Sequence, residues 1–123
     1  MQILQTTAEL PREDFVFETK IGRDDDGAPQ YDTALPFEAN VEEYNDQYVT
    51  MPDGSKVMTP LVLYVVAEIA GVAQAVPERE ARVTRTSTGR MYIVMHRNVV
   101  TGLDYDTTEP DHFRLKLAEE DAV

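Results

Sequence analysis

Two histidines, His96 and His112, are the first residues in this 123-residue sequence that could bind a metal or act as acid and base. The sequence has no cysteine, so a zinc ion would need one or both histidines together with carboxylates from distant segments. The histidines also lack the spacing that would place them on one helix face. We therefore expect no metal site built on them.

The acidic stretch GRDDDG raises the possibility of a calcium loop. With Gly27 at position six of an EF-hand loop, Asp24 and Asp26 take positions three and five. Gly22 and Thr33 then occupy positions one and twelve, where Asp and a bidentate Glu are required. We expect a solvated acidic loop at which adventitious Ca²⁺ binding stays open.

Other catalytic patterns are absent from the sequence. It contains no G-x-S-x-G nucleophile elbow, no phosphate-binding loop and no dinucleotide fingerprint. Its many carboxylates follow no pattern that would select a pair for acid–base work. We expect a protein that is not an enzyme and has no cofactor, and an enzyme that uses carboxylates and His96 is the least favoured alternative.

The net charge of −12 is distributed unevenly along the chain. Residues 1–55 carry −10, residues 56–102 carry +3 and residues 103–123 carry −5. Tight binding to a nucleic-acid backbone needs neutralising Lys and Arg contacts, so a conventional DNA-binding module is disfavoured. A solvated surface that keeps the protein soluble is the simplest explanation of the acidic ends.

Five arginines lie within nineteen residues of the basic middle segment: Arg79, Arg82, Arg85, Arg90 and Arg97. They could follow a DNA phosphate track. They could also form a patch that is complementary to an acidic protein neighbour, and this chain is itself acidic at both ends. We favour the protein partner, because the overall charge opposes DNA affinity.

Period-two alternation of apolar and polar residues predicts β-strands in several segments. Phe37–Tyr44 is the clearest case, with Phe37, Ala39 and Val41 on one face. Asp14–Ile21 alternates in the same way, with Phe15, Phe17 and Ile21 on one face, and HFRLKL near the end alternates Phe, Leu and Leu against basic residues. Between the first two strands, residues 22–36 are rich in Gly, Pro and Asp and predict a surface loop.

The remaining segments complete a mostly β pattern. Leu61–Val66 predicts an apolar strand, and Ala81–Ser87 with Met91–Val99 predicts a hairpin that turns at Thr88 and Gly89. Residues 67–80 suit either a short helix or a bent strand extension. About six short strands without a strongly periodic helix predict a small antiparallel barrel or sandwich.

Two predicted strands, Leu61–Val66 and Met91–Met95, are apolar on both faces. One face of a small barrel should meet solvent, so the outer face needs a cover. A neighbouring subunit, the N-terminal arm or the segment 68–80 could each supply it. The apolar window Val57–Val76 has the length of a membrane span, but it contains Pro, Glu and Gln and lacks a positive-inside flank, so we expect no membrane insertion.

The stretch VTMPDGSKVMT predicts a tight turn between the clearest strand and the most apolar one. Pro52 suits position i+1 of a type I turn, Asp53 suits i+2, and Gly54 can take a positive φ after them. Turn chemistry alone leaves two possibilities open, namely a routine hairpin tip and a functional projection.

The order of these segments resembles the head-completion, or stopper, proteins at the head–tail connector of long-tailed phages (siphophages). The resemblance covers about Asp14 to Ala118 and includes a strand of Tyr-x-Val type after a short turn, here GRMYIV with Tyr92 and Val94. The sequence departs from the family in the longer connection at residues 69–80 and in having Arg82 where an Asp is expected.

The resemblance implies a small antiparallel β-barrel and a structural role in the virion. Similar proteins form a hexameric ring under the portal and its adaptor ring, close the DNA exit channel after packaging, and present a surface to the tail terminator or tail tube. The expected location is the virion head–tail interface, with the host cytoplasm during assembly. DNA would pass through the ring without specific binding.

In some members of that family, a loop that projects from the barrel into the lumen helps to form the gate. The corresponding segment here is Tyr44–Met58. Its candidate channel-facing residues are Tyr44, Tyr48, Met51, Asp53, Gly54 and Met58. The five arginines are then candidate contacts with the ring or with a partner.

The resulting prediction is a single domain over residues 1–123. It comprises a flexible arm (1–13), the barrel (14–118), the projecting hairpin (44–58) and a frayed tail (119–123). A tail terminator or another tail-proximal ring protein is an alternative within the same setting. A small β-barrel that binds a ligand or a peptide at its mouth is an alternative of a different class.

Overall fold

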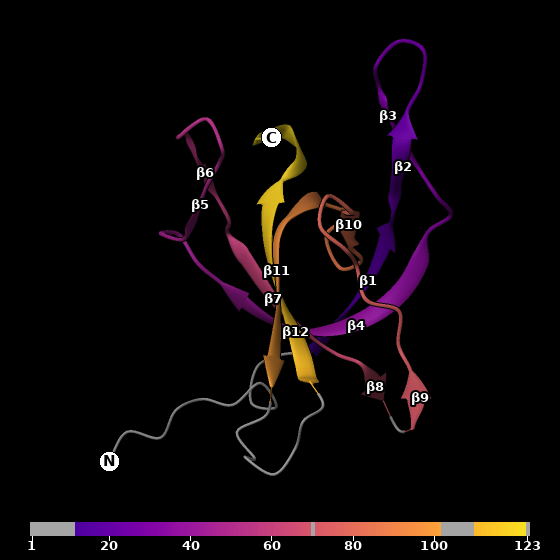
Figure 1. Cartoon of the computed structure of the whole chain (residues 1–123). Coiled ribbons are helices and arrows are strands. Elements are labelled where there is room, and N and C mark those ends of the chain that lie inside the picture. The colour runs from indigo at the N-terminus through magenta and orange to yellow at the C-terminus, as the bar shows by residue number, and fades with distance from the viewer. Residues whose placement is uncertain (1–11, 70, 102–109, 123) are drawn as a thin grey trace.

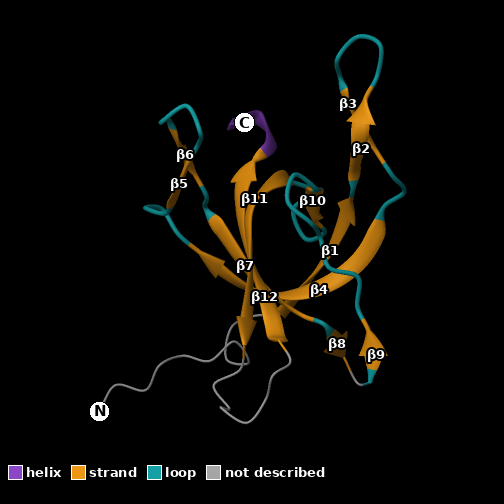
Figure 2. Cartoon of the chain, in the orientation of Figure 1, coloured by secondary structure: helices purple, strands orange, loops and turns teal. Residues whose placement is uncertain are grey.

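The computed structural model describes residues 12–69, 71–101 and 110–122, and the chain is mostly β-strand in these ranges (Figure 1, Figure 2). This result confirms the expectation of a mostly β chain. The elements are β1 (Arg12–Glu18), β2 (Lys20–Arg23), β3 (Pro29–Tyr31), β4 (Leu35–Glu43), β5 (Tyr48–Thr50), β6 (Lys56–Met58), β7 (Leu61–Val66), β8 (Glu68–Ile69), β9 (Val72–Ala73), β10 (Arg82–Arg85), β11 (Met91–Thr101), β12 (Pro110–Glu119) and the 3₁₀ helix η2 (Glu120–Ala122).

Six of the strands form one antiparallel sheet in the order β1-β10-β11-β12-β7-β4. β4 also pairs with β1, from Arg12 opposite Asn40 to Phe17 opposite Leu35, so the pairing returns to its start and the sheet closes as a barrel. The last strand of the sequence, β12, lies between β7 and β11. Closure of a sheet removes the unpaired strand edges that would otherwise attract other chains.

The core consists of the inward-facing residues of the six barrel strands. Phe15 and Phe37 stack with ring centroids 5.4 Å apart, and Phe17 meets Phe37 edge to face at 5.5 Å. Each large apolar side chain buried in this way stabilises the fold by about 1.5–3 kcal/mol. The alternation predicted for β1, β4 and β12 is confirmed by the buried residues Phe15, Phe17, Phe37, Ala39, Val41, Leu115 and Leu117.

The two strands that are apolar on both faces differ in how their outer faces are used. On β7, Val62 is only 1% exposed and lies beside Glu42 and Lys116 in the sheet register, so it is buried within the single chain. On β11, Met91 is exposed, whereas Ile93 lines a cavity. A neighbouring subunit is therefore not needed to cover Val62.

The segment predicted as a loop after β1 is a second hairpin, formed by β2 and β3. The chain leaves the barrel after Glu18, and the N–H of Asp32 donates to the carbonyl of Thr19 (2.8 Å) at the base of this hairpin. Ile21 was expected to face the core with Phe15 and Phe17, but it is 62% exposed because it lies on the projecting β2.

The segment 68–80 begins as a short β8–β9 hairpin and not as a helix. Beyond it, the side-chain amide of Gln74 bridges β4 and β7. Its Oε1 accepts the N–H of Glu38 (2.7 Å), and its Nε2 donates to the carbonyls of Val66 (2.9 Å) and Glu38 (3.2 Å). This side chain satisfies backbone groups just beyond the point where β4 and β7 stop pairing.

The ends of the described chain are more ordered than the sequence predicted. β1 begins at Arg12, inside the segment predicted as a flexible arm, and residues 1–11 lie outside the described residues. Glu119 belongs to β12, where it pairs with Tyr92, and residues 120–122 form η2. The segment predicted as a frayed tail therefore contains the end of a strand and a turn of 3₁₀ helix, and Nη1 of Arg82 lies 3.6 Å from Glu120.

Candidate functional site

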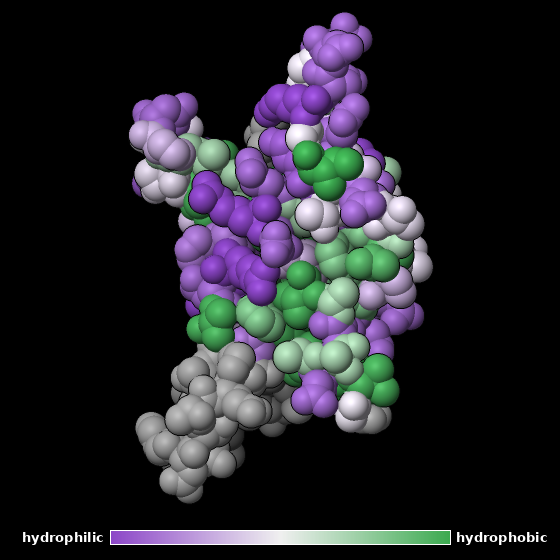
Figure 3. All heavy atoms as spheres, turned by 45° about the vertical axis from the view of Figure 1, so that its right-hand side comes forward, coloured by the Kyte–Doolittle hydropathy of each residue, from purple (hydrophilic) through white to green (hydrophobic). Residues whose placement is uncertain are grey.

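Two hairpins, β2–β3 and β5–β6, project from the same end of the barrel, and η2 lies at that end as well (Figure 1). The β8–β9 hairpin lies at the opposite end (Figure 1). Each hairpin is a separate two-stranded sheet. In the face seen in Figure 3, hydrophilic residues predominate at the tips of the projecting hairpins, and hydrophobic residues lie from the centre of the barrel to its right and lower parts, beside a hydrophilic cluster on the left.

The β5–β6 hairpin is anchored at its base by two main-chain hydrogen bonds. The N–H of Tyr44 donates to the carbonyl of Pro60 (2.8 Å), and the N–H of Thr59 donates to the carbonyl of Gln47 (2.8 Å). Above them, three residue pairs connect β5 and β6. The segment that leaves the barrel between β4 and β7 therefore projects as an ordered hairpin.

The tip of this hairpin has the turn that the sequence predicted. The N–H of Gly54 donates to the carbonyl of Met51 (2.9 Å), which places Pro52 and Asp53 at the two central positions, and Gly54 has φ +88°. The carboxylate of Asp53 accepts the N–H (2.9 Å) and the Oγ–H (2.6 Å) of Ser55. These hydrogen bonds lower the pKa of Asp53.

The candidate channel-facing residues occupy different places on the hairpin. Tyr48 and Met58 are opposite each other and are 52% and 42% exposed, so they expose apolar surface to solvent. Met51 lines a cavity below the tip. Tyr44 lies at the base, where its hydroxyl donates to Glu42 (2.8 Å).

The base of the hairpin carries a small polar cluster. Oε1 of Glu42 accepts the hydroxyls of both Tyr44 (2.8 Å) and Tyr64 (2.6 Å). Burial, followed by the hydrogen bond to Glu42, raises the pKa of each tyrosine, so both stay protonated donors. Arg114 lies opposite Tyr64 in the sheet, and its buried Nε has no hydrogen-bond partner among the described residues. Through its hydrogen bond to Glu42, Tyr44 holds the base of the hairpin against β4.

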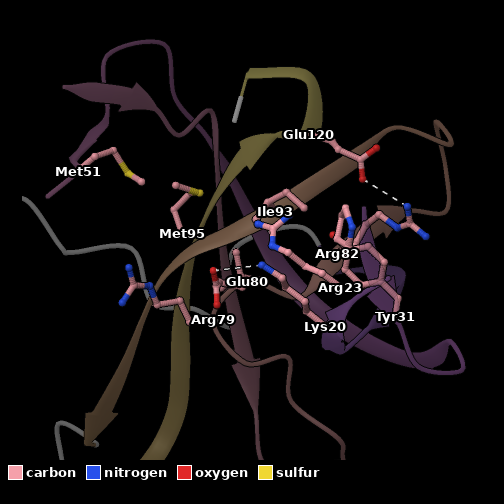
Figure 4. Close-up of a pocket in the computed structure, with 12 residues that line it drawn as sticks. Lys20, Arg23, Tyr31, Met51, Arg79, Glu80, Arg82, Ile93, Met95 and Glu120 are labelled. Atoms are coloured by element: carbon pink, nitrogen blue, oxygen red, sulfur yellow. Dashed lines mark ion pairs between the residues drawn. The ribbon is translucent and has the colours of Figure 1, made fainter. Parts of the chain in front are cut away.

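A cavity of about 650 Å³ lies between the two projecting hairpins, against β11 and η2 (Figure 4). Four cationic side chains and two carboxylates line it, so the cavity is basic in a chain that is strongly acidic. Its lining residues are Lys20, Arg23, Pro29, Tyr31, Met51, Arg79, Glu80, Arg82, Ile93, Val94, Met95 and Glu120.

Arg82 is the most extensively paired cation of the cavity. Its Nε donates to Glu18 (3.0 Å), its Nη1 lies 3.6 Å from Glu120, and its guanidinium stacks over the ring of Tyr31 at 4.3 Å. The hydrogen bond to Glu18 raises the pKa of Arg82. Nζ of Lys20 lies 3.6 Å from Glu80, so each of these two cations already has a carboxylate partner.

The other two cations of the cavity lack such partners. Arg79 makes no ion pair or side-chain hydrogen bond with the part of the chain that the structure describes, and it is exposed. Arg23 donates through Nη1 to the carbonyl of Gly27 (2.8 Å) but has no carboxylate partner in the same ranges. The cavity therefore contains two guanidinium groups whose charge is not neutralised by a described carboxylate.

Glu80, next to Arg79, has φ +74°, a left-handed conformation that non-glycine residues rarely adopt. Such a residue costs about 1–2 kcal/mol and persists where its surroundings hold it. Here, its N–H donates to the carbonyl of Val94 (2.8 Å) and its carboxylate pairs with Lys20. The backbone at the cavity wall is thus held in a strained turn.

The five arginines of the basic segment are not brought together. Arg79 and Arg82 line the cavity. Arg85 is engaged by Glu13 and Glu43, Arg90 pairs with Glu119 (3.5 Å), and Arg97 stacks over the ring of Phe113 at 4.5 Å. Their role as partner contacts stays a prediction, and Arg79 and Arg97 are the two of the five that have no carboxylate partner among the described residues.

Lys20, Arg23 and Tyr31 are cavity residues that the sequence analysis did not single out. They lie on β2 and β3, in and next to the segment interpreted as a loop. The dipeptide Asp26–Gly27 is a recognised hairpin-turn signal and could have indicated these strands.

The two histidines lie apart from this cavity. His96 is exposed on β11 opposite Lys116, and His112 contacts the ring of Tyr64 edge to face at 5.6 Å. Within residues 12–69, 71–101 and 110–122, no group of three His, Asp or Glu side chains could hold a metal ion. In the acidic loop, Asp24 instead accepts main-chain hydrogen bonds.

The comparisons with known proteins do not assign the chain to a family. No protein-family model matches it, and no curated protein matches it. In the described ranges, no helix has the length and apolar character needed to cross a membrane. Function is therefore inferred from the barrel, the projecting hairpins and the basic cavity.

Proposed function

We propose that this chain is a structural virion protein, the stopper of a phage head–tail connector, which closes the DNA exit channel after packaging and joins the head to the tail. The observation that carries the proposal is the ordered β5–β6 hairpin, which leaves the barrel between β4 and β7. This is the interval in which the resemblance places a channel-closing loop. The six-stranded antiparallel sheet supports the same proposal.

The charges suit a channel through which DNA must slide. A ring multiplies each charge by its number of copies, and the chain carries −12. An acidic lumen repels the phosphate backbone, so DNA does not adhere to it. In the closed state, exposed Tyr48 and Met58 of neighbouring hairpins would meet and provide adaptable apolar contact area.

The test uses a hairpin shortened without disturbing the barrel. Replacing Met51–Ser55 by Asn-Gly keeps Thr50 opposite Lys56 and leaves the base hydrogen bonds in place. We expect the shortened protein to join portal–adaptor particles but to let filled heads release their DNA, measured as nuclease-sensitive DNA. Val72→Ser, at the exposed β9, is the matched control and should retain DNA.

Two results would contradict the proposal. If the wild-type protein never joins portal–adaptor particles, it is not a stopper, and its presence on tails made without heads would point to a tail terminator. If the shortened protein assembles and DNA is fully retained, the hairpin is not the gate.

The cavity favours a second candidate function, a small barrel module that binds an anionic ligand. Its volume of about 650 Å³ lies in the range typical of small-molecule sites. In that case, the isolated monomer would bind a small anion and gain thermal stability, and would do so without any virion partner.

A further inference from the structure

The cations without a carboxylate partner make the cavity suited to bind carboxylates. Lys20 and Arg82 have carboxylate partners at 3.6 and 3.0 Å, whereas Arg23 and Arg79 have none among the residues described. A guanidinium group presents paired N–H donors that match the two oxygens of a carboxylate. Met51 and Met95 line the same cavity and can adapt their shape to a polypeptide.

The same chain carries a matching acidic group at the tip of the β2–β3 hairpin. Oδ1 of Asp24 accepts the N–H groups of Asp26 and Ala28, both at 2.9 Å, and so holds the turn. Asp25 and Asp26 are exposed there, and their carboxylates have no hydrogen bond or ion pair with other described residues. A preorganised turn presents these carboxylates with little further loss of conformational entropy.

The carboxylates at this tip do not neutralise the cavity of their own molecule. Arg23 and Pro29 flank the tip and line the cavity, and Nη1 of Arg23 donates to the main-chain carbonyl of Gly27 (2.8 Å). Asp25 and Asp26 nevertheless form no ion pair with Arg23, Arg79 or any other described residue, although the hairpin is fully paired. Two complementary surfaces in different places on one chain produce a heterologous contact, which repeats into a ring or an open filament.

We propose that the cavity binds the acidic tip of the β2–β3 hairpin of a second copy of this chain, with Asp25 and Asp26 of that copy contacting Arg79 and Arg23. This inference rests on the proposed function in requiring a ring of like subunits. It specifies which side chains connect neighbouring copies, and it makes the basic cavity one half of each contact.

Reciprocal charge reversal tests the contact. Arg79→Glu places an acid in the cavity, and Asp25→Lys with Asp26→Lys makes the tip basic. Each variant alone should associate at least about tenfold more weakly than wild type, because a like charge then faces a like charge. An equimolar mixture should recover association, because every Lys tip then finds a Glu cavity and every Asp tip an Arg cavity. Sedimentation velocity measures both effects.

Matched controls and a covalent probe sharpen this experiment. Arg12→Glu and Glu68→Lys reverse exposed charges at other places and should leave association unchanged. Since the chain has no native cysteine, Arg79→Cys mixed with Asp26→Cys should form a disulfide between copies under oxidising conditions. A similar yield from Arg12→Cys with Asp26→Cys would contradict the contact.

The inference is wrong if the mixture associates no better than its components, or if wild type stays monomeric both in solution and on portal–adaptor particles. Stabilisation of the monomer by inorganic phosphate without any effect of the tip would instead indicate a small-anion site. A Lys-tip variant that still retains DNA in filled heads would remove this contact and leave the stopper proposal standing. If association depends on the tip but the protein does not bind to heads, the contact stands and the stopper proposal is removed.

Discussion

Arg85 connects three strands of the barrel through one side chain. Its Nε and Nη2 donate to the two carboxylate oxygens of Glu13 at 2.9 and 2.6 Å, and its Nη1 donates to Glu43 at 3.1 Å. Its side chain is only 15% exposed. This geometry differs from that of an isolated surface pair, which contributes little to stability.

We expect Arg85→Ala to lower the free energy of unfolding by about 2–3 kcal/mol, because it leaves a half-buried carboxylate without its partner. Urea unfolding measures this loss. The matched control is Arg90→Ala, at an exposed pair, which should change the free energy of unfolding by less than about 0.5 kcal/mol. Equal losses for both variants would show that the bidentate geometry contributes nothing extra.

The same pair makes stability depend on pH. Hydrogen bonding from Arg85 lowers the pKa of Glu13 below its ordinary value of 4.5 in the folded state. Its stabilising contribution is therefore fully present above pH 4.5 and is lost as the pH falls through the lower, folded-state pKa. Glu13→Gln should reduce the acid dependence of the unfolding midpoint between neutral pH and pH 3, and an unchanged slope would contradict this role.

Sequence alone could not assign this role to Arg85. Its place in a basic segment suggested a contact with a partner. The acids that neutralise it, Glu13 and Glu43, lie 72 and 42 residues away in the sequence. They meet Arg85 because β1 pairs with both β10 and β4, and long-range register of this kind is not written in local composition.

At the scale of elements, Gln74 acts as a tie between two strands. We expect Gln74→Ala to cost about 1–3 kcal/mol, because the N–H of Glu38 and the carbonyl of Val66 would lose their partner. Amide exchange at Glu38 should accelerate most. The control is Gln30→Ala on the exposed β3, which should leave this exchange unchanged.

A strand could be predicted from the sequence when one of its faces is buried in the core. β1, β4, β7 and β12 each bury one, and their apolar residues revealed them in the sequence. β2–β3 and β8–β9 project from the barrel and leave most side chains in solvent. Main-chain hydrogen bonds hold them, so they lack the period-two pattern that predicts a strand.

At the scale of the whole molecule, the cavity combines residues from parts of the sequence with opposite charge. Lys20 and Arg23 come from the acidic first part, and Arg79 and Arg82 from the basic middle. The net charge of each sequence segment therefore indicated that the middle segment is basic, but it did not indicate that a basic cavity would form. The fold had to place β2–β3 beside residues 79–82 before the cavity could be recognised.

The closed order of the six barrel strands also predicts which truncations the chain tolerates. A chain that ends at residue 109 lacks β12, which lies between β7 and β11 and supplies the buried Leu115 and Leu117. We expect it to show no cooperative thermal transition by circular dichroism. Removing residues 120–123 is the control and should preserve the transition, since the barrel strands remain; loss of the transition there would give η2 an essential role.

The position of β12 also bears on when the protein can fold during synthesis. This strand follows the other five barrel strands in the sequence, yet it is the one that joins β11 to β7 and completes the circuit. Until it leaves the ribosome, the nascent chain holds two strand edges and an incomplete apolar core that nothing else in the sheet order can close. The barrel therefore cannot close before β12 has been synthesised, and the open intermediate is the stage at which these chains are most exposed to association with one another.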